Sequence, residues 1–244
     1  SVVCKQYHRD KVDKAVCVSE LIALLALGDH PNIVKFHGLT NKGGVFKGDY
    51  QFVYSFAQHG SLDEMFYSTG KHAEMRKLLS TPAALLSIAQ DIARGLAYVH
   101  SRGLIHRDIS LRNLVMNEHG IVQLIDFGLA RFVDEDGKYS EGKMGSYAYI
   151  GDLSSVIGQD ATAKDDIYRV GVVLAKIITG NKDLDIKQFV AHLPSSAQQT
   201  AEGYQVNQLV VKAIIACLQH DADKRPTARQ LSELLESPEE PNHG

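Results

Sequence analysis

Two short polar stretches constrain this chain more than any other feature of its sequence. His106, Arg107 and Asp108 stand together, Asn113 follows five residues after Asp108, and residues 126–128 (Asp-Phe-Gly) begin eighteen residues after it. Seven fixed residue types at this spacing arise by chance on the order of 10⁻⁹ per starting position. Two carboxylates and an amide on loops at one sheet edge can hold a divalent cation, and Mg²⁺ prefers such oxygen ligands. The sequence therefore predicts a site that binds a metal and orients a hydroxyl.

Composition places the chain among ordinary globular proteins. Its 244 residues are 44% hydrophobic, which favours one large domain or two small ones that share a core, and excludes disorder as the overall state. Six prolines and three cysteines exclude a collagen-like chain and a disulfide scaffold. The odd cysteine count predicts reduced thiols and a cytoplasmic location.

Charge and hydropathy narrow the classes of partner. The net charge of −3 makes nucleic-acid binding an unfavoured function, because a protein neutralises nucleic-acid phosphates with clustered Lys and Arg. The longest apolar stretches, residues 21–27 and 170–174, are much shorter than the ~20 residues that cross a bilayer. We therefore expect no nucleic-acid partner and no membrane span.

The first part of the chain is predicted to form a small sheet with one helix. A β-branched run at residues 1–7 indicates a strand that ends near Lys5. Apolar residues at helical spacing predict a helix over 14–27, and residues 33–38 and 50–55 are typical of strands.

The remainder is predicted to be mainly helical. An amphipathic helix is expected over 81–100 with Pro82 in its first turn, and a short apolar strand over 121–125. Further helices are expected over 163–179, 204–220 and 227–236, and the acidic tail 237–244 is expected to be disordered.

The order of these motifs resembles that of the eukaryotic-type protein kinases. HRDISLRN followed by DFG is similar to their catalytic and metal-binding loops, VVCK to the strand that carries their phosphate-binding lysine, and FVYSFAQHGSL to the hinge between their lobes. DDIYRVG and DADKRPT resemble two structural signatures of their helical lobe. The resemblance implies an α+β, bilobal kinase-like fold with a truncated small lobe and hinge at 1–57 and a helical lobe at 58–236.

The resemblance also implies the roles of individual residues. Asp108 would accept or orient the proton of the attacking hydroxyl, and Asn113 and Asp126 would hold Mg²⁺. Lys5, paired with Glu20, would bind the α- and β-phosphates of ATP.

At the hinge, the family binds adenine through the backbone, which implies that Ser55 C=O and Ala57 N–H form these bonds. The side chains of Val3 and Val115 are also assigned to the ATP site. Tyr54 stands at the family's gatekeeper position, where its side chain would close the pocket behind adenine. The family's internal hydrophobic column, anchored by an aspartate, corresponds here to Leu24, Phe36, His106, Phe127 and Asp166.

Two departures from the family pattern affect the expected activity. Only four residues precede Lys5, so the Gly-rich hairpin is not part of this sequence. Either the sequence is trimmed or the small lobe is reduced, and both imply weak ATP binding. The family's Ala-Pro-Glu motif is Gly-Asp-Leu at 151–153. We expect Arg225 either to pair with Asp152 or to lie buried without its partner.

The acceptor and its control are left open by the sequence. Ser110 and Arg112 after the catalytic aspartate are more similar to tyrosine kinases, whereas Ser146 is similar to serine/threonine kinases. Arg107 suggests control by phosphorylation of the activation segment, by an upstream kinase or another regulatory partner, with Tyr139 and Ser140 as candidates and Tyr147 as a weaker one. The basic residues Lys71, His72, Arg76 and Lys77 are interpreted as a solvated surface.

Three functions remain in competition at this level. The first is an ATP-dependent protein kinase that acts on a protein Ser/Thr or Tyr hydroxyl in signalling. The second is a pseudokinase scaffold with weak or no turnover. The third, a small-molecule phosphotransferase of the aminoglycoside-kinase kind, fits less well because such enzymes lack the signatures that contain Asp166 and Arg225.

Overall fold

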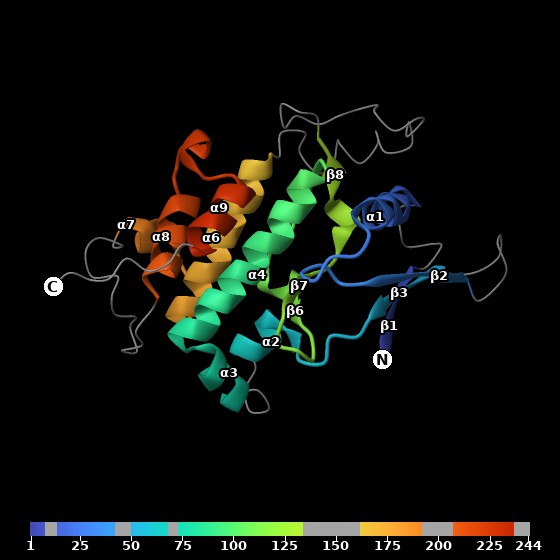
Figure 1. The fold of residues 1–244 in the computed structure, drawn as a ribbon, viewed down its shortest axis with the longest axis horizontal. Helices are drawn as coiled ribbons and strands as arrows, with labels where there is room; N and C mark the ends of the chain where they lie inside the picture. Colours follow the sequence, from blue (N-terminus) through green and yellow to red (C-terminus); the bar gives the residue numbers. More distant parts are fainter. Residues whose placement is uncertain (8–13, 42–49, 68–72, 134–161, 192–206, 237–244) are drawn as a thin grey trace.

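A small antiparallel sheet with one helix lies next to a larger, mainly helical part (Figure 1). This computed structural model describes residues 1–7, 14–41, 50–67, 73–133, 162–191 and 207–236. The predicted tail at 237–244 is outside these residues, and the division at residues 57 and 58 stays a prediction.

The small sheet forms because short β-branched and aromatic runs pair around a buried phenylalanine. Its strands have the order β1-β3-β2 and are β1 (Val2–Tyr7), β2 (Phe36–Asn41) and β3 (Tyr50–Ser55). Lys5 lies opposite Phe52 in the register of β1 and β3. Phe52 is fully buried, and its ring lies 5.5 Å from that of Phe36. The helix α1 (Lys14–Leu27) has the predicted bounds.

The strand expected at 33–38 is wrong in its position, since β2 begins only at Phe36. Ile33 and Val34 instead meet β7 (Val122–Leu124) of the larger part. The Val34 N–H donates to the Leu124 carbonyl at 3.0 Å, and the Leu124 N–H donates to the Asn32 carbonyl at 2.9 Å. Both apolar side chains are buried. The segment therefore ties the small sheet to the larger part. β1 also extends to Tyr7, beyond the predicted end near Lys5.

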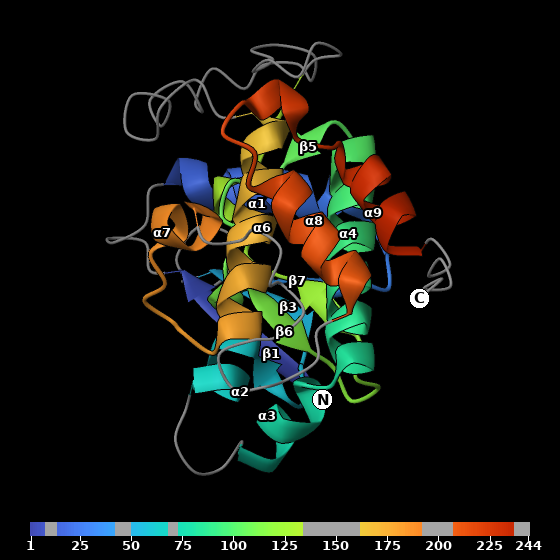
Figure 2. The ribbon, with the colours of Figure 1, turned by 90° about the vertical axis from the view of Figure 1, so that its left-hand side faces the viewer.

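The helices of the larger part pack side by side, with short strands and turns between them and the small sheet (Figures 1 and 2). The helices are α2 (Leu62–Tyr67), α3 (Ala73–Leu79), α4 (Pro82–Ser101), α6 (Ala163–Thr179), α7 (Ile186–Ala191), α8 (Gln208–Cys217) and α9 (Ala228–Glu236). The other strands and 3₁₀ turns are β4 (Gly60–Ser61), β5 (Leu104–Ile105), η1 (Leu111–Asn113), β6 (Leu114–Met116), η2 (Phe127–Leu129), β8 (Arg131–Phe132) and η3 (Ala222–Lys224). None of the helices in the described ranges is long and apolar enough to span a bilayer.

Local capping chemistry explains where the predicted helices begin and end. The Thr81 side chain accepts a hydrogen bond from the Ala84 N–H at the start of α4. Thr162 and Asp165 form a reciprocal capping box at the start of α6, which ends at Gly180 with φ of 64°. The predicted helix at 204–220 is confirmed over α8, within narrower bounds.

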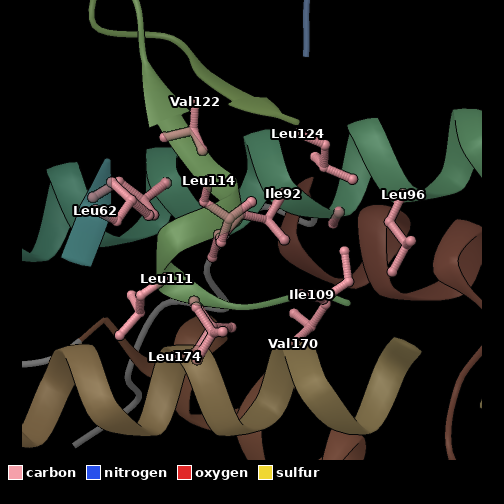
Figure 3. Close-up of a cluster of buried hydrophobic side chains, with 14 of the residues drawn as sticks. Leu62, Ile92, Leu96, Ile109, Leu111, Leu114, Val122, Leu124, Val170 and Leu174 are labelled. Carbon is pink, nitrogen blue, oxygen red and sulfur yellow. The ribbon is translucent and has the colours of Figure 1, made fainter. Parts of the chain in front are cut away.

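Apolar side chains anchor the 106–113 loop to the core. This loop contains the predicted catalytic residues Asp108 and Asn113. Ile109, Leu111 and Leu114 lie between α4 and α6, packed in the core with side chains of both helices (Figure 3). Each is at most 6% exposed. Burial of these three side chains fixes the path of the backbone between them.

At Gly95, α4 lies in close contact with Asn32 and Leu124. A Cβ atom there would lie 2.6 Å from Leu124 Cδ1 and 2.9 Å from the Asn32 carbonyl oxygen. We predict that Gly95→Ala lowers the free energy of unfolding by about 1–3 kcal/mol, because the backbone oxygen has to move. Alanine's better helix propensity, about 1 kcal/mol, offsets only part of this cost. Urea denaturation measures the change, with Ser87→Ala on the exposed side of α4 as control. A Gly95→Ala variant that is more stable than the parent would contradict the packing.

Candidate active site

Lys5 joins two carboxylates that come from distant parts of the chain. Its Nζ donates to both carboxylate oxygens of Glu20 on α1, at 3.1 and 2.9 Å, and to Asp126 Oδ1 at 2.8 Å. The Glu20 side chain is fully buried, whereas those of Lys5 and Asp126 are 37% and 44% exposed. β1, α1 and the start of η2 therefore meet at one ammonium group, which faces outward together with Asp126.

Tyr54 adds a third donor to the same buried carboxylate. Its hydroxyl donates to Glu20 Oε1 at 2.7 Å, and its side chain is buried. The sequence identified Tyr54 by its position but not this bond. One feature could have indicated this bond. Tyr54 lies on the middle strand and faces α1, where the buried Glu20 lies opposite.

The electrostatics of this group follow from burial and charge. Burial raises the pKa of Glu20, and Lys5 and Tyr54 only partly oppose this shift. Burial alone would lower the pKa of Lys5, but Glu20 and Asp126 outweigh it and the pKa is raised. Burial and then Glu20 raise the pKa of Tyr54. Lys5 therefore keeps its positive charge, and Tyr54 remains a neutral donor.

Asp108 and Asn113 are held together within the 106–113 loop. The Asn113 Nδ2 group donates to the Asp108 backbone oxygen at 2.9 Å and to Asp108 Oδ2 at 2.8 Å. These two bonds use the donors of the amide and leave its oxygen as the group able to meet a cation. The orientation of both side chains is thus fixed before any ligand binds.

The Asp166 carboxylate on α6 anchors the beginning of this loop. It accepts the backbone N–H groups of His106 and Arg107, each at 2.8 Å, and it bonds to His100 Nε2 at 2.9 Å. Burial would raise the pKa of Asp166, but the hydrogen bond and charge of His100 and the neighbouring His106 together lower it. Arg107 has a positive φ of 70°, a conformation that a non-glycine residue keeps only under firm restraint.

His106 connects the loop to the stretch that contains Asp126. Its Nδ1 accepts the Asp108 N–H at 3.2 Å, so the proton lies on Nε2, which donates to the Ile125 carbonyl at 3.0 Å. The Ile125 N–H donates to the Asn113 carbonyl at 3.0 Å. The predicted catalytic stretch and metal-binding stretch are therefore linked through a buried imidazole and the backbone.

The predicted hydrophobic column is partly visible in direct contacts. The rings of His106 and Phe127 lie 4.9 Å apart, and both side chains are fully buried. Leu24 is buried in the same core, and Phe36 packs against this core and lies 5.6 Å from the Tyr54 ring. Asp166 bonds to the backbone of His106, as the resemblance implies.

The residues assigned to adenine lie on successive elements between the two parts of the fold. Val3 is 45% exposed and lies opposite Tyr54 in the register of the small sheet. Ser55 ends β3, and Ala57 lies between β3 and β4. Val115 is buried in β6, opposite Ser61 of β4. The contact of these residues with a nucleotide stays a prediction.

The donor set fits Mg²⁺ that is shared with a phosphate ligand. Asp126 offers a partly exposed carboxylate, and Asn113 offers an amide oxygen. Across the described ranges, no three His, Cys, Asp or Glu side chains form a group that could hold a metal ion. Mg²⁺ commonly takes one or two protein ligands and completes its shell with water and substrate phosphates.

The expectation that Arg225 is buried without a partner unless Asp152 binds it is wrong. Asp152 lies outside the described residues, and Arg225 already has several partners. Its guanidinium lies 3.7 Å from Asp165 and 4.8 Å from the ring of Tyr168. It also donates to the carbonyl groups of Gln219, Lys164 and His220. Carbonyl oxygens can satisfy a guanidinium as well as a carboxylate can.

Only some of the other predicted residues lie within the described ranges. Arg107 and Ser110 are half-buried in the 106–113 loop, whereas Arg112 is exposed. Arg76 and Lys77 are exposed on α3, in agreement with a solvated surface. The remaining candidates lie outside the described ranges: Lys71, His72, Tyr139, Ser140, Ser146 and Tyr147.

Comparison with known proteins agrees with this geometry. Residues 1–235 match the family described as protein tyrosine and serine/threonine kinase, and the chain belongs to this family. The bilobal α+β kinase fold is thereby confirmed.

The curated relatives are distant and longer. The probable serine/threonine-protein kinase PBL5 of Arabidopsis thaliana is 33% identical over 72% of this chain and 44% of its own length. The leaf rust 10 disease-resistance locus receptor-like protein kinase-like 1.4 of Arabidopsis thaliana is 27% identical over 96% of this chain and 38% of its own length. For fibroblast growth factor receptor 1 of Dugesia japonica the identity is 26%, over 89% of this chain and 26% of that protein. The chain thus spans less than half of each relative.

Burial of His106 predicts a loss of stability in mild acid. Burial lowers the pKa of its imidazole in spite of the nearby Asp166. In the unfolded chain, His106 binds a proton near pH 6.5, whereas in the folded protein it stays neutral at that pH. The free energy of unfolding therefore falls as the pH drops below about 6.5. The loss attributable to this group approaches about 1.4 kcal/mol per pH unit.

Urea denaturation of the wild type and His106→Phe between pH 7.5 and 5.5 tests this sign. The variant keeps a ring next to Phe127 but cannot titrate, so we expect its stability to be lower at pH 7.5 and to fall less steeply. Equal slopes in the two proteins would show that His106 does not supply the pH dependence.

Proposed function

We propose that this chain is an ATP-dependent protein kinase that transfers the γ-phosphoryl group to a hydroxyl of a protein substrate. The observation that carries the proposal is the bonding of Lys5 to both Glu20 and Asp126, together with the hydrogen-bonded link from Asp126 through Ile125 and His106 to Asp108. Burying charges is costly, and this set brings an ammonium group and carboxylates together at one place, as phosphoryl transfer requires.

In this proposal, Lys5 supplies fixed positive charge to the α- and β-phosphates of ATP. Phosphoryl transfer spreads negative charge over the phosphate oxygens, so catalysis depends mainly on positioning and countercharge. Glu20 and Tyr54 orient the ammonium, because the buried carboxylate takes donors from both. Preorganised charge of this kind costs no rearrangement when the reaction occurs.

Asp126 and Asn113 would hold Mg²⁺, which supplies countercharge to the transferring phosphoryl group when it is bound. The amide nitrogen of Asn113 donates to Asp108, so the amide oxygen is the atom that would bind the metal. The bond of Asp126 Oδ1 to Lys5 leaves Oδ2 for the same purpose.

Asp108 would orient the acceptor hydroxyl and receive its proton. Asn113 binds only Asp108 Oδ2 among the side-chain oxygens, and Oδ1 is left for a substrate. The loop geometry that Asp166 imposes fixes the carboxylate's direction, which is the requirement for general-base catalysis.

We further propose that adenine binds along the hinge, to Ser55 C=O and Ala57 N–H and between Val3 and Val115. In this proposal the small lobe comprises residues 1–57 and the helical lobe residues 58–236, and Ser55 and Ala57 would lie at the junction between them. The family as a class uses ATP and Mg²⁺, which supports both cofactors.

The acceptor, regulator and compartment are finer parts of the proposal. The name of PBL5 favours a Ser or Thr acceptor over Tyr. We also propose regulation by an upstream kinase or another partner, because Arg107 could bind a phosphate group on the activation segment. The three cysteines, all free, favour a cytoplasmic protein.

Transfer of radiolabelled phosphate from ATP tests the proposal most simply. We expect transfer to a general protein substrate by the wild type at millimolar ATP, and a loss of about 100-fold or more in Asp108→Asn. Asp223→Asn, an exposed aspartate in η3, is the matched control and should be unaffected. Thermal stabilisation by Mg·ATP without transfer in either protein would instead support a scaffold that binds ATP and does not turn over.

A further inference from the structure

Arg131 is a charged residue buried at a junction of three elements. It lies in β8, separated from the end of η2 by one residue, and is 5% exposed. Its Cα pairs with that of Ile105 in β5, the residue before His106. A guanidinium stays protonated when buried, so its N–H groups must find acceptors inside the protein.

One of these acceptors is the hydroxyl of Ser19 on α1. Arg131 Nη1 donates to Ser19 Oγ at 2.9 Å and to the Ala130 carbonyl at 2.7 Å. Ser19 Oγ in turn donates to the same carbonyl at 3.4 Å. Ser19 is itself 6% exposed and directly precedes Glu20, so this contact and the Lys5 bond restrain adjacent residues of one helix.

Gly128 shows that α1 lies next to the same segment. A Cβ atom on Gly128 would lie at ordinary van der Waals distance from α1, 3.4 Å from Val16 Cγ1 and 3.5 Å from Glu20 Oε2, so η2 and α1 are direct neighbours. An outward shift of α1 would break the hydrogen bond that Ser19 accepts from a buried charge, and it would separate α1 from η2. Loss of one hydrogen bond to a charged group is unfavourable even where other partners remain.

We propose that Arg131 is a positioning residue, which holds α1 inward through the Ser19 hydroxyl and so couples the segment after Asp126 to the Lys5–Glu20 pair. Coupling of this kind is reciprocal. A change that moves Arg131 loosens α1, and a change that moves α1 releases Arg131. The effect on phosphoryl transfer rests on the proposed function, whereas the restraint on α1 does not.

The chain contains its own reporters for this restraint. Cys17 lies on α1, two residues before Ser19, and is partly buried, so its alkylation rate reports opening of the helix. Cys217 in α8 is fully buried and reports global unfolding. Cys4 is exposed in β1, and Cys4→Ser removes its background signal from every protein compared.

Alkylation of Cys17 and Cys217 by N-ethylmaleimide, resolved by mass spectrometry, is measured in Ser19→Ala and Arg131→Met. We expect Cys17 to react about tenfold faster in both variants, because a hydrogen bond to a charged group is lost. Cys217 should react at the parent rate. Ser87→Ala, an exposed serine within α4, controls for the change of helix propensity and should leave both rates unchanged.

Two results would overturn the proposal. An unchanged Cys17 rate in Ser19→Ala would show that the contact does not restrain α1. Equal acceleration of Cys17 and Cys217 would show that the contact only stabilises the whole fold.

A parallel transfer assay separates this inference from the proposed function. If the wild type transfers phosphate, Ser19→Ala should lower kcat and raise the KM for ATP, since Lys5 loses its fixed partner. If the wild type transfers none but Cys17 responds as expected, the proposed function fails and the restraint stands.

Discussion

The buried Asp166 carboxylate is the interaction on which the rest of the site depends. It accepts the backbone N–H groups of His106 and Arg107 from its place on α6, and so restrains the loop in which Asn113 donates to Asp108. Three donors compensate for the burial of its charge, and their combined effect keeps its pKa low. Ile109, Leu111 and Leu114 secure the same loop by apolar packing.

The second constraint is the position of α1, which decides whether Lys5 has a partner. Glu20 receives Lys5 from β1 and Tyr54 from β3, while the neighbouring Ser19 receives Arg131 from β8. Three strands therefore hold one turn of a single helix. Because α1 carries apolar residues on most of its surface, including the exposed Leu25, side-chain patterning alone would not fix its rotation. Polar contacts supply that specificity.

Much of this could be predicted from the sequence, since local signals determine it. The helices at 14–27 and 163–179 and the strand at 50–55 have the expected bounds, because periodicity and caps are properties of neighbouring residues. The structure brings the predicted polar residues into two bonded groups, Lys5 with Glu20 and Asp126, and Asp108 with Asn113. Their roles stay predictions. The strand at 33–38 was misplaced because Ile33 pairs with Leu124, a partner 91 residues away that no local pattern reveals. The Tyr54–Glu20 and Arg131–Ser19 bonds were missed for the same reason.

The central claim is that Lys5, Asp126 and Asn113 form one site that binds a nucleotide triphosphate together with its metal. Calorimetric titration of ATP into the wild-type chain, with Mg²⁺ and then with EDTA, tests it most directly. Because the two ligands would share the site, we predict that removal of Mg²⁺ weakens ATP binding by about tenfold or more. We also predict that Asp126→Asn abolishes this dependence on the metal. Equal affinity with and without Mg²⁺ in the wild-type protein would contradict the account.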